Sequence, residues 1–384
     1  MQNQFVCPFN LNSFKNANMN QNILIIGSGN HHNTLGVIRA IGRAGLGVDL
    51  VTYDNAKNNY IACSKYVTTH HILASKEELF GYLNSLEVNG EKQIIISCAD
   101  IVTEYLNQHR DILSKKFILP GTPIQGHMLE LMDKTTMISM AAKHNIFAPK
   151  VWHLPEDYNK VTFPCITKSH VSSHGGKADI IICHSKNKLD FFLKDNDDDI
   201  FVQSYINKKE EVQFIGCSLN GGDEIIIPGM TKVFRSQPNT NTGFLEYGPI
   251  DSFYDETVKN AKAYIKDCQY SGLFSIEFLR GQDDMIWFLE INFRNDGNAI
   301  CVTEAGINLP LIWVKANRGE NYKTEIKIPN KIIVMPEFQD FKLVLQRKVG
   351  IWQWLKDWMR TDAFMEYASD DKRPFFQYII DKIR

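Results

Sequence analysis

The sequence lacks paired cysteines of the CxxC kind, although its 384 residues include eight cysteines. Single, scattered cysteines favour neither a disulfide framework nor a zinc site, so we expect a protein of the reducing cytoplasm. No uncharged apolar run approaches the ~18–20 residues that a membrane-spanning helix needs. The first residues also lack the charged segment and apolar run of a signal peptide. The cysteines are Cys7, Cys63, Cys98, Cys165, Cys183, Cys217, Cys268 and Cys301.

The sequence also lacks an excess of charge of either sign. Lysine plus arginine number 42 and aspartate plus glutamate 44, which leaves a net charge of −2. A nearly balanced chain has no general attraction for a polyanion, so we expect no nucleic-acid partner. Any anionic ligand must be held by locally placed cations. Apolar residues make up 44% of the chain, which is enough for two or three packed units.

The N-terminal third has the pattern of a parallel α/β domain. Ile23–Ile26 is a short apolar run of the kind found in strands buried on both faces, and it ends at the glycine turn Gly27–Gly29. A helical pattern follows, and Val48–Val51 supplies a second strand, so we predict a βαβ unit with a parallel sheet. Two more buried strands are predicted over residues 94–97 and 117–119.

The glycine turn itself admits two interpretations. Glycines before a helix can bind a phosphate at the helix N-terminus. The third glycine of the dinucleotide-binding pattern is absent, however, because His32 stands three positions after Gly29. We therefore interpret the segment as an ordinary strand-to-helix turn, in a domain that frames a substrate and not a nucleotide. Adjacent side chains rarely reach one ion, so His31 and His32 are expected to be exposed to solvent.

Two polar segments in the middle of the chain suit a nucleoside triphosphate. Lys168 ends a short predicted strand, and a run rich in glycine and serine follows it to Gly176. Such a run can present backbone N–H groups to phosphates, although many surface loops have the same composition. The strand end at residues 203–206 can offer backbone groups to an adenine edge, and Glu210 or Glu211 can accept hydrogen bonds from ribose hydroxyls. Only one of these two should point inward, because side chains alternate along a strand.

The clearest signal for chemistry lies in a predicted hairpin with strands over residues 273–279 and 285–291. Glu290 stands within an apolar run, where an unpaired charge is costly to bury. Glu290 and Asn292 are two residues apart and project from one face. Glu277 on the neighbouring strand can complete a set of hard oxygen ligands for Mg²⁺. The alternative, a strand edge with solvated polar residues, explains less well why these oxygens fall in apolar strands.

Together these segments resemble the ATP-grasp superfamily in order and approximate spacing, although none is as specific as a Walker loop. The residues that carry the resemblance, within roughly residues 22–319, are Lys134, Lys168, the loop to Gly176, Gln203 to Ile206, Glu211, Glu277 and Glu290 to Asn292. Glu-Ile-Asn-Phe-Arg-Asn at 290–295 and the ending Asp-Lys-Arg-Pro-Phe-Phe at 371–376 are similar to D-aspartate-ligase-like carboxylate–amine ligases. The N-terminal βαβ unit is similar to the domain that precedes ATP-grasp in biotin-carboxylase-like members.

The resemblance implies a role for each matching residue. Arg294 and Lys168 would be catalytic, with Arg294 facing the γ-phosphate and an acyl phosphate. Glu277, Glu290 and Asn292 would hold one or two Mg²⁺ (or Mn²⁺) ions. The residues implied to bind ATP are Lys134, Lys168, Ser172, Ser173, Gly175, Gly176, Gln203, Tyr205, Ile206 and Glu211.

The fold class that the resemblance implies is α/β and α+β. The expected order is a disordered or loosely docked tail over residues 1–21, a parallel pre-ATP-grasp domain over 22–121, a two-lobed ATP-grasp domain over 122–330 with its lid at about 150–202, and a small helical segment over 331–384.

The implied reaction joins a small carboxylate to a small amine through an acyl phosphate, with amino acids and cell-wall precursors as candidate substrates. One alternative keeps the ATP chemistry but activates bicarbonate, as in biotin carboxylase or carbamoyl phosphate synthesis. Another is a nucleotide-binding regulatory protein without turnover, which the combination of Lys168, the metal carboxylates and Arg294 disfavours. A homodimer is common in the resembled group.

Two features nearer the C-terminal end keep open roles. Arg235 could bind a substrate carboxylate or simply lie on the surface. Trp352, Trp354 and Trp358 alternate with lysines and arginines on predicted helices. These helices could touch a membrane surface, as basic and aromatic amphipathic helices do. We favour packing on the protein body, because aromatic residues at helical spacing are usually core.

Overall fold

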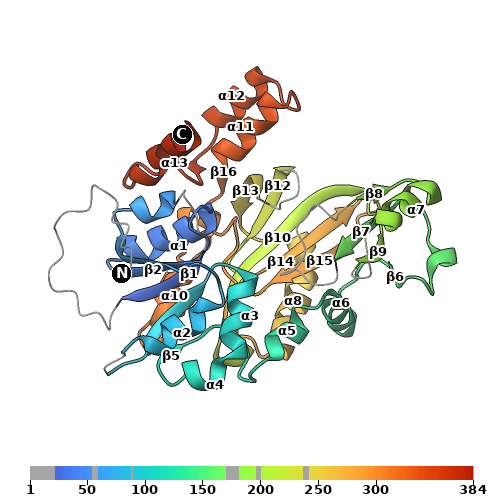
Figure 1. Ribbon diagram of the computed structural model, residues 1–384. Helices are drawn as coiled ribbons and strands as arrows, with labels where there is room; N and C mark the ends of the chain where they lie inside the picture. Colours follow the sequence, from blue (N-terminus) through green and yellow to red (C-terminus); the bar gives the residue numbers. More distant parts are fainter. Residues whose placement is uncertain are drawn as a thin grey trace.

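Apolar strands separated by short turns build the N-terminal sheet that the sequence predicts. The computed structural model of the chain describes residues 22–53, 59–87, 90–169, 181–195, 200–236 and 242–383. Five parallel strands form this sheet (Figure 1). Strand β1 is buried along its whole length, as its continuous apolar run predicts. In sheet order the strands are β3 (Val67–Ile72), β2 (Val48–Thr52), β1 (Ile23–Gly27), β4 (Gln93–Ser97) and β5 (Phe117–Ile118), with helices α1 (His32–Arg43), α2 (Glu78–Ser85), α3 (Asp100–Gln108) and α4 (Arg110–Leu113).

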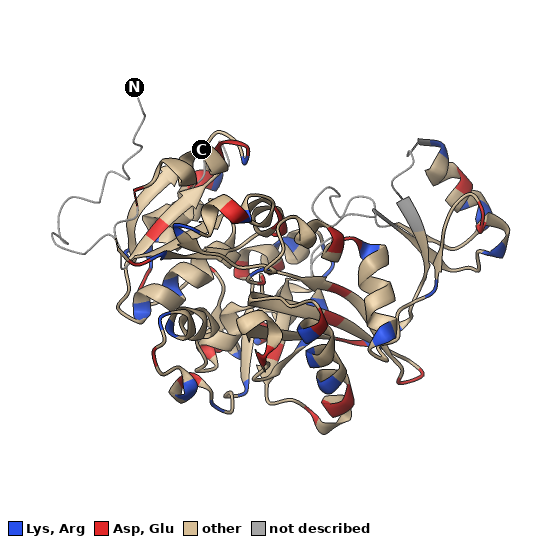
Figure 2. Ribbon diagram, turned by 90° about the horizontal axis from the view of Figure 1, so that it is seen from below, with Lys and Arg blue, Asp and Glu red and all other residues tan. Residues whose placement is uncertain are grey.

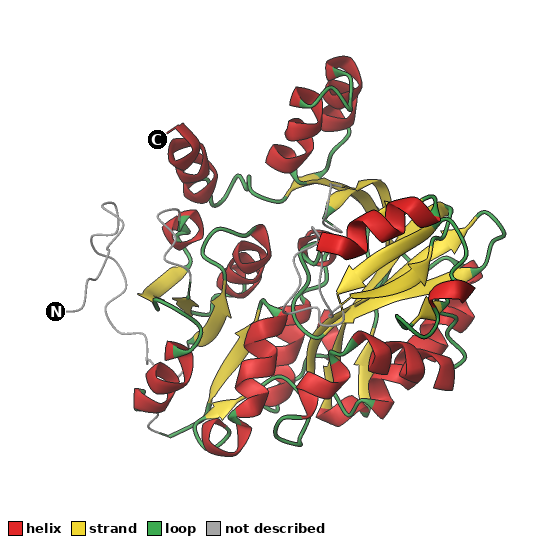
Figure 3. Cartoon of the chain, turned by 45° about the vertical axis from the view of Figure 1, so that its right-hand side comes forward, coloured by secondary structure: helices red, strands yellow, loops and turns green. Residues whose placement is uncertain are grey.

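A larger, mostly antiparallel sheet of eight strands forms the body of the remaining chain (Figure 3). The predicted hairpin is confirmed, because β14 pairs with β15, and β10 pairs with β11 in a second hairpin. In sheet order its strands are β15 (Ile286–Asn292), β14 (Gly272–Gly281), β10 (Lys208–Leu219), β12 (Met230–Ser236), β13 (Gly243–Gly248), β16 (Ile332–Met335) and β17 (Ala363–Phe364), with β11 (Glu224–Ile226) paired to β10.

A third sheet of four strands lies at the side of the molecule opposite the N-terminal sheet (Figure 1). Its own small core contains Trp152, Cys165 and Val202. Residues 205–207 connect it to β10 of the large sheet. We call it the lid sheet after the lid predicted at about residues 150–202, and its role as a lid stays a prediction. Its elements are β6 (Val151–Trp152), β9 (Ile200–Ser204), β7 (Cys165–Ser169), β8 (Ile182–Cys183) and helix α7 (Lys186–Asp195).

Alternation along β10 gives the large sheet two different faces. Val212 and Phe214 pack into a core with helix α8. Ile215 and Cys217 point the other way, into a core that continues through α9 and α10 to the N-terminal sheet. The two sheets therefore share one packed core, which fixes the N-terminal domain beside the large sheet. The helices of this region are α5 (His127–Leu131), α6 (Lys134–Lys143), α8 (Asp255–Asp267), α9 (Ile300–Glu304) and α10 (Leu309–Asn317).

The C-terminal helices are held by charge as well as by packing. Arg235 donates from Nε and Nη2 to the two carboxylate oxygens of Asp340, at 2.9 and 2.6 Å, and from Nη1 to Asp357 at 2.8 Å. Arg235 is therefore occupied within the protein, which argues against a role in binding a substrate carboxylate. The helices are α11 (Glu337–Leu345), α12 (Ile351–Met359) and α13 (Arg373–Ile383).

Two expectations about side-chain exposure are wrong. His32 is buried at 3% exposure, with Nδ1 3.7 Å from a carboxylate oxygen of Glu366, because α1 packs under the C-terminal segment. The three tryptophans do not all pack on the protein body. Trp354 contacts Phe341, but Trp352 is 76% exposed.

Three further points concern the segment around Asp133, the N-terminal tail and membrane-spanning helices. Between residues 125 and 144 the chain forms two helices, α5 and α6, which are separated at Asp133, the residue that caps α6. The tail over residues 1–21 lies outside the described residues. In the described part of the chain, no helix is long and apolar enough to cross a membrane.

Candidate active site

A polar stripe interrupts the apolar face that the large sheet turns toward α10. On β10, the apolar residues Ile215 and Cys217 lie on this face, and the next residue on the same face toward the start of the strand is the polar Gln213. Gln213 is paired with Glu277 of β14, and Glu277 is paired with Glu290 of β15. Side chains at paired positions share a face and lie close together. The register therefore places Gln213, Glu277 and Glu290 in a row across three strands. We call this row, together with Asn292 on the same face, the polar stripe.

Hydrogen bonds connect the buried members of this stripe. Asn292 donates from Nδ2 to Glu277 at 3.0 Å and to Ser275 at 3.2 Å. Asn298 donates from Nδ2 to Oε1 of Gln213 at 3.0 Å. Glu277 is only 3% exposed, and a buried carboxylate needs such donors to offset its loss of hydration. The predicted metal ligands Glu277, Glu290 and Asn292 thus lie together.

Arg294 joins this stripe to the N-terminal domain. Its Nη2 donates to Oδ1 of Asn292 at 3.1 Å, and its Nη1 donates to Asp296 at 3.1 Å. Its Nε donates to Asp100, the first residue of α3, at 3.0 Å. Because α3 follows β4, the contact brings the carboxyl edge of the parallel sheet to the stripe. Ligands of open parallel sheets bind at that edge.

Further bonds close the joint between the two domains. Asn33 donates from Nδ2 to the carbonyl oxygens of Cys98 and Asn295, at 2.9 and 2.8 Å. Gly27, at the end of β1, has no room for a side chain, because an added Cβ would meet Thr34 Oγ1 at 2.5 Å. Close packing therefore explains this glycine, as the interpretation of an ordinary turn requires.

The charges around Arg294 are mainly negative. Burial alone would lower the pKa of its guanidinium, but Asp100, Asp296 and Glu277 raise it above the usual value. Burial raises the pKa of the Asp100 carboxyl, Arg294 opposes this, and Glu290 adds to it. Three carboxylates thus act on the Arg294 guanidinium, and Glu290 acts on one of them, Asp100. Acidic and basic residues are otherwise interspersed over the molecule (Figure 2).

The donor set fits a hard divalent cation. Glu277 and Glu290 are directly opposed on adjacent strands, a placement that repels unless a cation lies between the carboxylates. Carboxylate and amide oxygens are the ligands Mg²⁺ prefers. Among the described residues, no group of three or more histidine, cysteine or acidic side chains could by itself hold a metal. An ion at the stripe would therefore need Asn292, water or phosphate oxygens as further ligands.

The structure separates the two glutamates between which the sequence left a choice. Glu211 is two residues from Gln213 and lies on the stripe's face, where it accepts from Lys208 at 2.6 Å. Glu210 points to the opposite face, where the hydroxyl of Tyr254 donates to it at 2.6 Å. The face of the stripe thus carries Glu211 and not Glu210.

The structure describes only some of the other residues that were predicted to contact ATP. Lys134 begins α6 and makes no ion pair with any residue that the structure describes. Lys168 belongs to β7, where it is paired with Phe201. Gln203 is buried in β9 and donates to the carbonyl of Pro149 at 3.3 Å. Tyr205 and Ile206 are half-buried and lie in the connection from the lid sheet to the large sheet. Ser172, Ser173, Gly175 and Gly176 lie outside the described residues.

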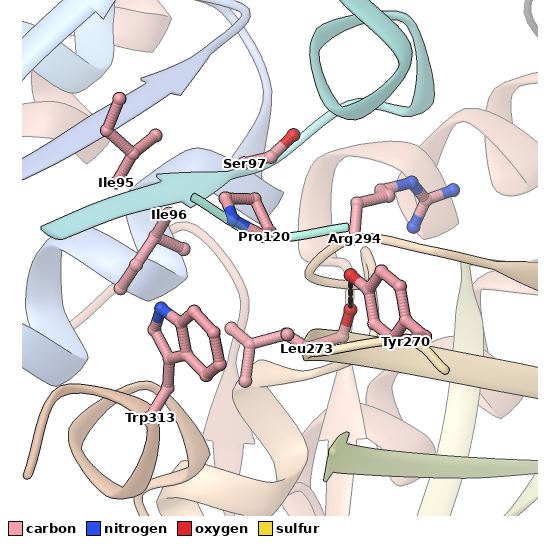
Figure 4. A pocket seen from close by; sticks show the side chains of 9 residues that line it. Ile95, Ile96, Ser97, Pro120, Tyr270, Leu273, Arg294 and Trp313 are labelled. Atoms are coloured by element: carbon pink, nitrogen blue, oxygen red, sulfur yellow. Dashed lines mark hydrogen bonds between the residues drawn. The ribbon is translucent and has the colours of Figure 1, made fainter. Parts of the chain in front are cut away.

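A small pocket opens beside Arg294 at the joint of the two domains (Figure 4). Its lining is mainly apolar, with Ile96 of β4 on one side and Leu273 and Trp313 on the other. The hydroxyl of Tyr270 donates to the carbonyl of Leu273 at 2.8 Å and closes part of the wall. Apart from Arg294, the lining is mainly apolar, so we assign the pocket to the packing of the joint.

Sequence patterns missed several residues of this site. Gln213 could have been found, because it is a polar residue that stands between the apolar residues Val212 and Phe214. Asp296 follows the 290–295 motif directly. Asp100 had no comparable signal, because its contact with Arg294 spans 194 positions of sequence.

Comparison with known proteins defines the fold. No protein-family model and no curated protein matches the sequence. Solved structures do match over most of the chain. N5-carboxyaminoimidazole synthetase from Staphylococcus aureus superimposes with a TM-score of 0.65 at 16% identity, covering 85% of each chain. The chain has the ATP-grasp fold.

Two further ATP-grasp structures match with similar scores. L-amino acid ligase from Bacillus licheniformis gives a TM-score of 0.59 at 12% identity, covering 80% of this chain and 77% of that one. The biotin carboxylase domain of 2-oxoglutarate carboxylase from Hydrogenobacter thermophilus gives 0.61 at 15% identity, covering 82% and 73%. At these identities the likeness establishes the ATP-grasp fold alone.

Proposed function

We propose that the chain is an ATP-dependent, ADP-forming ligase that activates a carboxylate as an acyl phosphate and joins it to an amine. The observation that carries the proposal is that Glu277, Glu290 and Asn292 lie on one face of β14 and β15, with Arg294 bonded to Asn292 just past the end of β15. In an ATP-grasp fold, oxygen donors and a guanidinium at this place suit the phosphates of ATP and a divalent cation. The neighbours named for carboxyaminoimidazole synthesis and amino-acid ligation support the class of reaction.

ATP would bind between the lid sheet and the stripe. Lys134 and Lys168 would contact the phosphates, and the loop with Ser172, Ser173, Gly175 and Gly176 would close over them. Gln203, Tyr205 and Ile206 would border the adenine, with Glu211 on the ribose. A carboxylate on a strand can accept from both ribose hydroxyls, which is why the face of Glu211 matters.

The chain's residues would act chiefly by positioning and by charge. Glu277, Glu290 and Asn292 would hold Mg²⁺ (or Mn²⁺), which when bound neutralises phosphate charge. Arg294, held by Asp100 and Asp296, would offset the charge that builds on the γ-phosphoryl group as a substrate carboxylate oxygen attacks phosphorus. The amine would then attack the acyl carbon and expel phosphate. Closure over the site would exclude water, which otherwise hydrolyses the acyl phosphate.

Isotope transfer tests the proposal directly. Purified protein with ATP and Mg²⁺ would be screened for phosphate release over amino acids, hydroxy acids, cell-wall precursors and bicarbonate. An ¹⁸O-labelled carboxylate that forms an acyl phosphate leaves one labelled oxygen in the released phosphate. The Glu290→Gln variant should lose this transfer, whereas Glu256→Gln, at an exposed position on α8, should keep it.

Label transfer from bicarbonate alone would support the bicarbonate-activating alternative. ATP binding without ADP release on any substrate would instead indicate a regulatory protein and overturn the proposal.

A further inference from the structure

Helix α12 turns its polar side inward and its apolar side outward. Asp357 is its one buried residue, at 2% exposure, and it is bonded to Arg235. On the opposite side, Trp352 is 76% exposed and Met359 is 71% exposed. A helix that packs on a protein core normally shows the reverse arrangement. The outer face of α12 is therefore an apolar surface that the described protein leaves uncovered.

Helix α11 extends the same surface. It buries the carboxylates of Glu337 and Asp340, while Leu345 at its end is 69% exposed. Ile351, across the turn at the start of α12, is 43% exposed. The two helices project together from the body of the molecule, away from the polar stripe (Figures 1 and 3). We call Leu345, Ile351, Trp352, Trp358 and Met359 the outer apolar surface.

Cations surround the outer apolar surface. Residues 341–360 contain five lysines and arginines and a single acidic residue, which is Asp357. Asp357 is buried, where it binds Arg235 and also pairs with Arg360 at 3.0 Å, so the stretch has no further carboxylate to offset Lys342, Arg347, Lys348 and Lys356. Arg347 and Lys348 lie exposed in the turn between the helices. The chain as a whole has a net charge of −2, so this local excess stands out.

We propose that the outer apolar surface docks on a lipid bilayer that carries anionic headgroups. Tryptophan, leucine, isoleucine and methionine can enter the headgroup boundary, while nearby lysines and arginines contact the lipid phosphates. A nucleic acid would match the cations but leave the aliphatic side chains unused. A second copy of the chain in a two-fold contact would bring the same cations face to face. The bilayer satisfies both the apolar and the charged parts of the surface.

Vesicle co-sedimentation of the full chain tests the proposal. Vesicles of phosphatidylglycerol with phosphatidylcholine should bind the protein at least about tenfold more strongly than phosphatidylcholine alone, because each surface cation adds attraction to anionic lipid. Two variants, Trp352→Ser with Met359→Ser and Arg347→Glu with Lys348→Glu, should each lose most of this binding. The matched control, Ile328→Ser with Lys259→Glu, changes residues that are 84% and 77% exposed elsewhere, and it should bind like the parent.

A second measurement covers the case in which a variant fails to fold. Brominated lipid should quench the fluorescence of the unaltered protein, and Trp352→Phe should keep vesicle binding while losing part of that quenching. Equal binding to both vesicle types, or full binding by the two surface variants, would overturn the proposal. So would light scattering that shows a dimer dispersed by Trp352→Ser with Met359→Ser, because a second copy would then cover the surface. Phosphate release without vesicles should not change in any of these variants, which keeps this test separate from that of the ligase proposal.

Discussion

The Nε of Arg294 lies 3.0 Å from a carboxylate oxygen of Asp100, and the two residues belong to different domains. Arg294 follows the last strand of the hairpin, and Asp100 opens the helix after β4 of the parallel sheet. The guanidinium also contacts Asp296 and Asn292. Its planar fork is therefore held in one orientation by both domains. The proposed catalytic cation depends on the docking of the N-terminal domain.

Arg294→Lys is the first test of this relationship. A lysine keeps the charge but cannot contact Asp100, Asp296 and Asn292 at once. We expect substrate-dependent phosphate release to fall about 10²- to 10³-fold, as for the loss of an oriented transition-state donor. ATP binding, measured by calorimetry, should change much less. Unchanged turnover would remove Arg294 from the mechanism.

The opposed carboxylates of Glu277 and Glu290 predict opposite effects on stability and on metal binding. Glu290→Gln removes a like-charge pair, so without divalent ions the free energy of unfolding should rise by about 0.2–1 kcal/mol. The same change removes a proposed ligand, so stabilisation by Mg²⁺ with an ATP analogue should shrink. Thermal unfolding with and without Mg²⁺ measures both effects. If Mg²⁺ with the ATP analogue stabilised the variant as much as the parent, a metal role for Glu290 would be contradicted.

Arg235 and Arg360 form a matched pair for measuring what holds the C-terminal helices. Both contact Asp357, but Arg235 also binds fully buried Asp340, whereas Arg360 is 51% exposed. Arg235→Leu removes this cation from fully buried Asp340 and leaves Asp357 with Arg360 alone, so it should cost about 3–5 kcal/mol. Arg360→Leu should cost at most about 1 kcal/mol. Amide hydrogen exchange in α11 and α12 should rise for the first variant only.

Glu366 predicts a loss of stability as the pH rises. Burial raises its pKa well above 4.5, and the charge of Glu337 adds to this, so the folded protein retains a proton that the unfolded chain releases. Stability from this group is complete below pH 4.5 and is lost as the pH rises through the folded pKa. Glu366→Gln should therefore flatten the fall in melting temperature with rising pH.

The comparison is best made above pH 6.5. Burial lowers the pKa of His32, the neighbour of Glu366, below 6.5, so above that value this histidine is neutral in both folded and unfolded states. Glu320→Gln, at a site that is 50% exposed, is the control and should follow the parent. Parallel curves for Glu366→Gln and the parent would show that Glu366 is ionised throughout.

Local patterns predicted the elements that depend on local chemistry. The apolar run at 23–26 forms the buried strand β1, and the predicted hairpin forms between β14 and β15. The placement of Glu277 near Glu290 followed from period-two alternation within one hairpin. These features need only neighbours in sequence or one short turn.

Contacts between distant segments could not be predicted in the same way. His32 is buried by residues more than 300 positions later, and Asp100 meets Arg294 across a domain boundary. Trp352 lies in a helical pattern that is typical of a core. The helix is instead bound to the protein through Asp357, so the side that carries Trp352 faces outward. The orientation of that helix follows from the ion pair between Arg235 and Asp357, which hydrophobic periodicity does not predict.

Strand β10 has Val212 and Phe214 in one core and Gln213 in the polar stripe. At this end of the strand, one face thus sustains the protein's architecture, while Gln213 on the other face is available to chemistry. A lineage could alter ligand preference by exchanging Gln213 without repacking Val212 and Phe214 in the hydrophobic interior.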